Sequence, residues 1–197
     1  MFAALLDTCT LWPSVRRDLL LSLSVEDLYR PLWSSAILAE LERSERAKQE
    51  RRGRDGKTAH QMARHLVETM TGVFDDACVR DWERLEGTFG LPDHNDEHVL
   101  AAAVTGNADV IVTDNLKDFP STYVPRHIEI QTPAAFAAYT VSVHPQRAAR
   151  AVTKMLARYT DPPVTRSELL DLIDARYGMA EAADALREVF DTGDEYG

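Results

Sequence analysis

Four carboxylates lie where an apolar strand is predicted to end or a helix to begin. They are Asp7, Glu40, Asp96 and Asp114. Asp7 directly follows the apolar run 2–6, and Asp114 follows the run 110–113. The carboxyl ends of the strands of an open α/β sheet border the crevice in which ligands bind. Acidic side chains that meet there repel one another, and a divalent cation with oxygen ligands relieves that repulsion. The pattern therefore favours a metal-dependent enzyme.

Glu40 lies on the inward face of its predicted helix. At about 100° per residue it falls between Ala36 and Ile37, whereas Glu42 points more towards solvent. A carboxylate on an inward face needs a partner, and either a metal ion or a basic residue can serve. The sequence alone leaves both partners open.

The remaining acids also have simpler interpretations. An aspartate at a helix start, such as Asp96, is a favoured N-cap. Asp114 and Asp118 are of a residue type that is common in turns. His94 and His98 flank Asp96, and we interpret them as surface or capping residues. The catalytic interpretation of the acids therefore rests on their joint placement.

Strands and helices alternate through the first two thirds of the chain. Apolar runs predict strands at 2–6, 29–33, 74–79, 109–113 and 127–130. Between them, helices are predicted at 12–23, 35–50, 58–70, 81–87 and 96–106. This alternation predicts an α/β fold with a mostly parallel sheet flanked by helices.

Beyond Thr132 the pattern changes to helices alone. They are predicted at 133–140, 145–158, 166–176 and 179–190. Thr165 and Glu168 have the spacing of a capping box at the start of the third. We therefore expect two domains, an α/β domain at 1–132 and a helical C-terminal extension at 133–197. The extension is not expected to read DNA, because its last helix begins with acidic residues.

The charge of the chain is unevenly distributed. A net charge of −10 and a pI of about 5.0 oppose a nucleic-acid partner when taken alone. The segment 43–64, however, has eight basic and three acidic residues, a balance of +5. This segment is either a solvated helix face with (i, i+4) pairs, such as Glu42 with Arg46, or a loop that contacts phosphates. Our candidates for contact with nucleic-acid phosphates are Arg51, Arg52, Arg54, Lys57 and Lys117.

The composition also indicates where in the cell we expect the protein to be located. No stretch approaches the ~18 consecutive apolar residues of a membrane-spanning helix. The short apolar run at the N-terminus has no basic stretch before it, which argues against a signal peptide. Cys9 and Cys78 form neither a disulfide framework nor a zinc spacing. We expect no membrane association and a cytoplasmic location with both thiols reduced.

Three stretches of the chain resemble the motifs of PIN-domain ribonucleases. They are Leu5-Leu6-Asp7-Thr8, the helix 35–41 around Glu40, and the long stretch from Asp96 through Asp114 to Asp118-Phe-Pro. The resemblance covers roughly residues 1–132 and is closest to the VapC-type toxins of bacterial toxin–antitoxin pairs. It implies a PIN-like, Rossmann-like sheet and an endoribonuclease that depends on Mg²⁺ or Mn²⁺.

The resemblance also implies roles for single residues. Asp7, Glu40, Asp96 and Asp114 would form the catalytic acidic quartet, and Asp118 would be a further metal-binding acid. Asp7, Asp96 and Asp114 would hold one or two cations, while Glu40 binds a second ion or orients the attacking water. The expected partners are an RNA substrate, a cognate antitoxin and a second copy of the chain in a homodimer.

Cys9 departs from the family pattern. Many members have Asn or Ser two residues after the first aspartate, and a thiol is a poor ligand for a hard cation. This departure calls the usual polar contact at that position into question. It also argues against a haloacid-dehalogenase-type phosphotransferase, which needs a second aspartate there. Two alternatives stay open: a PIN nuclease for RNA processing without an antitoxin, and a catalytically silent PIN module that binds RNA or protein.

Overall fold

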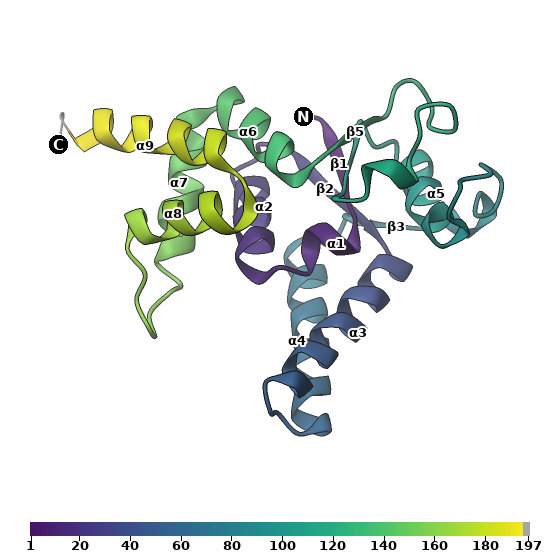
Figure 1. Cartoon of the computed structure of the whole chain (residues 1–197), viewed down its shortest axis with the longest axis horizontal. Helices are drawn as coiled ribbons and strands as arrows, with labels where there is room; N and C mark the ends of the chain where they lie inside the picture. Colours follow the sequence, from purple (N-terminus) through teal and green to yellow (C-terminus); the bar gives the residue numbers. More distant parts are fainter. Residues whose placement is uncertain (195–197) are drawn as a thin grey trace. The chain divides into compact units, whose positions relative to one another are not determined.

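The computed structural model describes residues 1–194, which form two compact units (Figure 1). The α/β unit comprises Phe2–Trp12 and Pro31–Ile130. The helical unit comprises Met1, Pro13–Arg30 and the chain from Gln131 onward. The helix 14–25 thus joins the C-terminal helices, although it lies within the α/β pattern of the sequence. The domain boundary at 132/133 remains a prediction.

The sheet has five strands in the order β3-β2-β1-β4-β5. Their bounds are β1 Ala3–Leu6, β2 Arg30–Ser34, β3 Cys78–Val79, β4 Val110–Val112 and β5 Glu129–Gln131. The pairs β1–β4 and β2–β3 are parallel. Every residue of β1 and β4 is buried, as expected for parallel strands that are covered on both faces. The predicted α/β fold with a sheet flanked by helices is confirmed.

The α/β unit also contains helices that precede or follow these strands. They are α1 Thr8–Leu11, α3 Ser35–Arg51, α4 Gly56–Val73 and α5 Glu97–Thr105, with 3-10 turns at Trp82–Arg84, His94–Asp96 and Leu116–Asp118. The Ser34 hydroxyl caps α3 by accepting from the Ile37 N–H. α3 and α4 pack side by side as a long hairpin (Figure 1). The hairpin turn carries the residues Arg52–Asp55.

Three elements differ from the sequence-based expectation. The short helix α1 was not predicted; it forms because the Asp7 carboxylate caps it by accepting from the Thr8 N–H. The strand expected at 74–79 shrinks to two residues, because a turn at Asp75 and Asp76 occupies its first half. The helix expected at 81–87 is a 3-10 turn of three residues.

The helical unit contains α2 Ser14–Val25, α6 Pro133–Val143, α7 Pro145–Leu156, α8 Arg166–Tyr177 and α9 Ala180–Asp194. The predicted capping box of Thr165 and Glu168 is present at the start of α8. Glu26, which is buried after α2, accepts from Arg150 and Lys154 of α7 at 3.2 and 2.6 Å. No helix within residues 1–194 has the length and apolar character needed to cross a membrane.

Candidate active site

A cavity of about 270 Å³ opens at the carboxyl end of β1, within the α/β unit. Its lining consists of Asp7, Thr8, Cys9, Trp12, Glu40, Ser44, Asp96 and Asn115. These side chains come from the start of α1, the inward face of α3, the start of α5 and the segment after β4. Three of the four predicted catalytic acids therefore meet at one cavity, which we call the acidic pocket.

Asp7 is fixed by hydrogen bonds at both carboxylate oxygens. Its side chain is buried, and Oδ1 accepts from the Thr8 N–H at 2.6 Å. Oδ2 accepts from the Thr113 hydroxyl at 2.7 Å and from the Cys9 thiol at 3.0 Å. Thr113 is the residue directly after β4, so it ties the ends of the two central strands together. Asp7 is therefore held in place at the floor of the acidic pocket.

Cys9 makes the polar contact that the sequence called into question. Besides donating to Asp7, its sulfur lies 3.3 Å from the Thr113 hydroxyl and accepts the Asp114 N–H at 3.2 Å. Burial, together with the charge of Asp7, raises the pKa of the Cys9 thiol to about 12. The group therefore stays a protonated thiol, which can donate a hydrogen bond as the hydroxyl of a serine does.

Glu40 has a basic partner, His98 of α5. Its Oε1 lies 3.3 Å from His98 Nε2, and its Oε2 accepts from the Thr8 hydroxyl at 2.6 Å. The His98 contact, followed by the Thr8 hydrogen bond, lowers the pKa of Glu40 against the effect of its partial burial. Burial alone would lower the pKa of His98, but the hydrogen bond and charge of Glu40 outweigh it and raise that pKa. Glu40 is thus held by a histidine and a threonine. Its side chain is 33% exposed, as is that of Glu42, so the predicted difference in exposure between the two is wrong.

His98 is the site residue that our sequence reasoning missed. It was expected at the surface or in a cap, but it is buried, with 7% of its surface exposed. Ala101 and Ala102, three and four positions later, are also buried and lie on the same helix face. The alanine-rich period that predicted α5 therefore contained a signal for an inward-facing histidine.

Asp96 is the least compensated acid of the pocket. It is the N-cap residue of α5, as the simpler interpretation predicted, but its side chain makes no capping hydrogen bond. Burial raises the pKa of Asp96 to about 6, and the charges of Asp7 and Asp118 add to the effect. This shift means that the ionised carboxylate lies among like charges in a partly dehydrated place. A cation near Asp96 would relieve both penalties.

The two acids after β4 lie farther out. The side chain of Asp114 is exposed and, of the residues described, is not among those that line the acidic pocket. Asp118 is half-buried in the 3-10 turn after β4 and acts on Asp96 through its charge. Asp118 is therefore electrostatically coupled to the pocket, and the Asp114 N–H donates to Cys9, which lines it.

The acidic side chains are of the type that binds a hard cation, although the residues described do not form a complete coordination site. Carboxylate oxygens are the ligands that Mg²⁺ takes in proteins, usually one or two of them together with water. Within residues 1–194, no group of three or more His, Cys, Asp or Glu side chains is close enough to hold a metal ion. A cation in the acidic pocket would therefore be held by few direct ligands, with water in the remaining positions.

The predicted RNA-contacting residues are exposed, and four of them gather at the hairpin tip. Arg51 ends α3, Arg52 and Arg54 lie in the turn, and Lys57 is in the first turn of α4, whereas Lys117 is in the 3-10 turn after β4.

Part of the basic segment behaves as a solvated helix face. Arg46 pairs with Glu50 at 2.9 Å rather than with Glu42, and Glu42 lies 3.6 Å from His60. The two interpretations of the segment 43–64 therefore apply to different parts of it: ion pairs along the helices, and a basic cluster at the tip.

The model of the PIN domain family matches residues 3–117 of the chain, more than half of its length. The chain belongs to the PIN-domain family. The model of the VapC50 C-terminal domain matches residues 133–188 of this PIN-domain protein, which covers most of its C-terminal helices. The resemblance to VapC-type proteins that the sequence indicated is thereby confirmed.

This PIN-domain protein is also similar to a protein of Mycobacterium tuberculosis (strain ATCC 25618 / H37Rv) whose name is "Putative ribonuclease VapC50". The two are 34% identical over 105 residues, which is 53% of this chain and 61% of the relative. The chain thus spans about three fifths of the length of that relative. No solved structure gives a significant match.

Proposed function

We propose that this PIN-domain protein is a divalent-metal-dependent endoribonuclease and the toxin of a toxin–antitoxin pair. One observation carries the proposal: Asp7, Glu40 and Asp96 line a single pocket where the central strands end. The pKa of Asp96, raised to about 6, marks that pocket as a place of uncompensated negative charge. Perturbed acids in a cleft are typical of functional sites.

The cation would be held by Asp7 and Asp96, with Asp114, Asp118 and Glu40 as further ligands, directly or through water. When bound, Mg²⁺ or Mn²⁺ supplies a water of lowered pKa and offsets negative charge on the scissile phosphate.

The side chains around the pocket prepare this chemistry. The hydrogen bonds of Thr113 and Cys9 fix the Asp7 carboxylate. Thr8 and His98 hold Glu40 so that its ionised form is available to accept a proton from, or orient, an attacking water. Because Thr8 contacts both Asp7 and Glu40, it links the two carboxylates into one unit.

RNA would be contacted by Arg51, Arg52, Arg54 and Lys57 at the hairpin tip, and by Lys117 near the pocket. A strand that reaches from the tip to the pocket would run along α3, which carries both Glu40 and Arg51. The acidic remainder of the chain would repel RNA, so this stretch is where binding is favoured.

Cleavage of single-stranded RNA tests the proposal. We expect the purified chain to cut RNA with Mg²⁺ or Mn²⁺ and to be inactive with a chelator. Asp7→Asn should abolish cleavage, because the amide keeps the size of the side chain but loses the charge. Asp76→Asn, which removes an exposed turn carboxylate from the same unit, is the matched control and should keep full activity. Full activity of Asp7→Asn, with folding verified by circular dichroism, would refute the proposal.

Growth on expression tests the toxin assignment separately. The wild-type chain should arrest growth, Asp7→Asn should not, and co-expression of the cognate antitoxin should restore growth. Cleavage without growth arrest would instead favour an RNA-processing nuclease that acts without an antitoxin. Homodimer formation and a cytoplasmic location remain predictions.

A further inference from the structure

A second cavity, of about 690 Å³, lies along α3 and shares lining residues with the acidic pocket. It is lined by Trp12, Ser44, Ala47, Glu50 and Arg51. Trp12 and Ser44 line both cavities. Glu40, Ser44, Ala47 and Arg51 follow one another at spacings of three or four residues, so they form one face of α3. A continuous surface therefore leads from the acidic pocket towards the hairpin tip.

Trp12 is the exposed tryptophan of the three in the chain. It is 37% exposed at the end of α1, whereas Trp33 and Trp82 are 0% and 6% exposed. Single exposed apolar residues are common on protein surfaces and need no ligand. Trp12, however, belongs to the wall of both cavities, beside the carboxylates of the acidic pocket. An aromatic face in that position is available to a molecule bound at the pocket.

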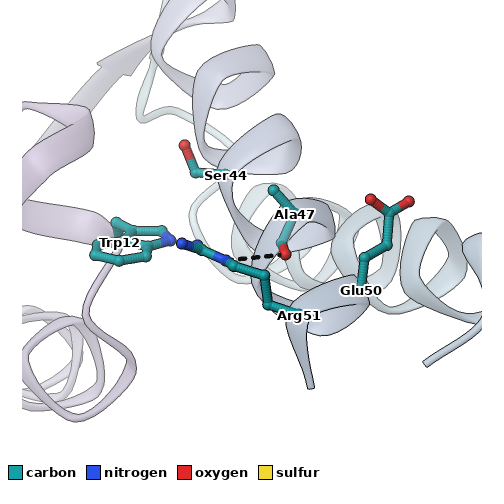
Figure 2. Close-up of a pocket in the computed structure, with 5 residues that line it drawn as sticks. All are labelled: Trp12, Ser44, Ala47, Glu50 and Arg51. Atoms are coloured by element: carbon teal, nitrogen blue, oxygen red, sulfur yellow. Dashed lines mark hydrogen bonds between the residues drawn. The ribbon is translucent and has the colours of Figure 1, made fainter. Parts of the chain in front are cut away.

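Arg51 faces Trp12 across the second cavity (Figure 2). Its Nε donates to the Ala47 carbonyl at 3.2 Å, one turn back along α3, which directs the guanidinium towards the indole. The small Ala47 side chain leaves the indole and the guanidinium as the two planar groups of the lining (Figure 2). Indole and guanidinium are both groups on which unstacked bases of single-stranded RNA stack.

Of the groups that line this cavity, the indole and the guanidinium lie together, whereas the Glu50 carboxylate points away from them (Figure 2) and is paired with Arg46 at 2.9 Å. A flat base can therefore stack on the exposed indole beside the guanidinium without meeting the Glu50 carboxylate.

We propose that Trp12 and Arg51 bind one nucleobase of single-stranded RNA next to the phosphate that is cut in the acidic pocket. This inference rests on the proposed endoribonuclease function and adds a base-binding subsite to it. The stacked base would fix the position of the neighbouring phosphate relative to Asp7 and Asp96, so loss of stacking would reduce kcat/KM.

An abasic scan of an RNA substrate tests the subsite. One base at a time is removed from an oligonucleotide that the wild-type chain cuts at a known bond, and kcat/KM is measured for each. We expect one position beside the cleaved bond to be sensitive, with a loss of about 5- to 150-fold, the range for one base–aromatic stack. Trp12→Ala should lower kcat/KM on the intact RNA by a similar factor and lose nothing further on that abasic RNA.

Two further variants separate stacking from packing. Trp12→Phe keeps an aromatic ring and should retain most of the activity, whereas Trp12→Leu keeps apolar volume and should behave like Trp12→Ala. Met62→Ala removes another exposed apolar side chain of the α/β unit, 41% exposed on α4, and should change nothing. Without metal, the oligonucleotide should quench the fluorescence of the exposed Trp12, and the quenching should disappear in Trp12→Phe.

The outcomes distinguish the subsite from the function on which it rests. If the wild-type chain cuts RNA but the abasic scan is flat, or Trp12→Leu matches wild type, the subsite is refuted and the nuclease assignment stands. If the wild-type chain neither binds nor cuts RNA, both the base-binding subsite and the nuclease assignment are refuted. If Trp12→Ala leaves RNA cleavage unchanged but weakens binding of the purified antitoxin, the surface belongs to a protein partner and the inference is overturned.

Discussion

Replacing Asp96 by asparagine should stabilise the folded protein at neutral pH while abolishing its activity. The pKa of Asp96 is raised from 3.8 to about 6, chiefly by burial and then by the charges of Asp7 and Asp118. A carboxyl whose pKa is higher in the folded than in the unfolded state holds its proton more tightly when folded. Stability therefore falls as the pH rises from about 4 through 6, and the full penalty is present above pH 6.

The size of the gain in stability follows from the shift in the pKa of Asp96. A rise of about two pKa units corresponds to about 3 kcal/mol at ~1.4 kcal/mol per unit. Because Asp96 is only partly buried, solvent screening reduces this to about 1–2 kcal/mol. For a chain of this length, that raises Tm by about 2–8 °C at pH 7.5. By the same linkage, the gain should fall to about a third of that value at pH 4.5.

Thermal unfolding of the wild type and Asp96→Asn, in chelator at pH 7.5 and 4.5, measures this difference. Asp76→Asn serves again as the control, because its carboxylate is exposed in a turn. The reasoning is refuted if Asp96→Asn is less stable than wild type at pH 7.5, or if its gain is the same at both pH values. Added Mg²⁺ or Mn²⁺ should stabilise the wild type more than the variant, because the variant has lost one of the carboxylates whose charge a cation neutralises.

Three other predictions concern the surroundings of the acidic pocket. Thr8→Val removes the hydroxyl that donates to Glu40 at 2.6 Å, and it should lower kcat by about tenfold because Glu40 would no longer be held in position to accept a proton. An unchanged kcat would show that Glu40 does not need the Thr8 hydrogen bond. Cys9, with its pKa raised to about 12, should resist alkylation by iodoacetamide at pH 8 in the folded protein and react on unfolding, so rapid alkylation of the native protein would contradict the buried thiol. Charge reversal at Arg52 or Arg54 should flatten the log–log salt dependence of RNA affinity by nearly one unit each, measured by fluorescence anisotropy, and an unchanged slope would mean that the hairpin tip does not contact phosphate.

Local signals in the sequence were sufficient for most of the fold. Buried parallel strands appear as continuous apolar runs, which is why the central strands β1 and β4 could be predicted to within a residue or two. The capping residues Ser34 and Thr165 marked helix starts because they act on backbone groups only a few positions away. The helix 14–25 shows the limit of such signals, since its apolar face predicts burial but does not say which partner buries it.

The site was less predictable, because its contacts join residues that are far apart in the chain. The sequence placed Asp7, Glu40 and Asp96 near one crevice but could not pair Glu40 with His98, which depends on how α3 packs against α5. Nor could it show that Thr113 and Cys9 share an oxygen of Asp7. The position of the Asp114 side chain depends on the turn after β4, where the Thr113 hydroxyl accepts from the Asn115 N–H at 3.0 Å, and the sequence does not show which way that turn directs Asp114.

Anomalous diffraction from crystals grown with Mn²⁺ tests the central claim, that the acidic pocket holds the cation used for RNA cleavage. We predict a peak in that pocket within about 2.5 Å of carboxylate oxygens of Asp7 and Asp96, close to the bond lengths of magnesium. The same peak should be missing from crystals of Asp96→Asn. A chain that cuts RNA with Mn²⁺ but shows no ion at the pocket, or binds it at a different place, would contradict the account.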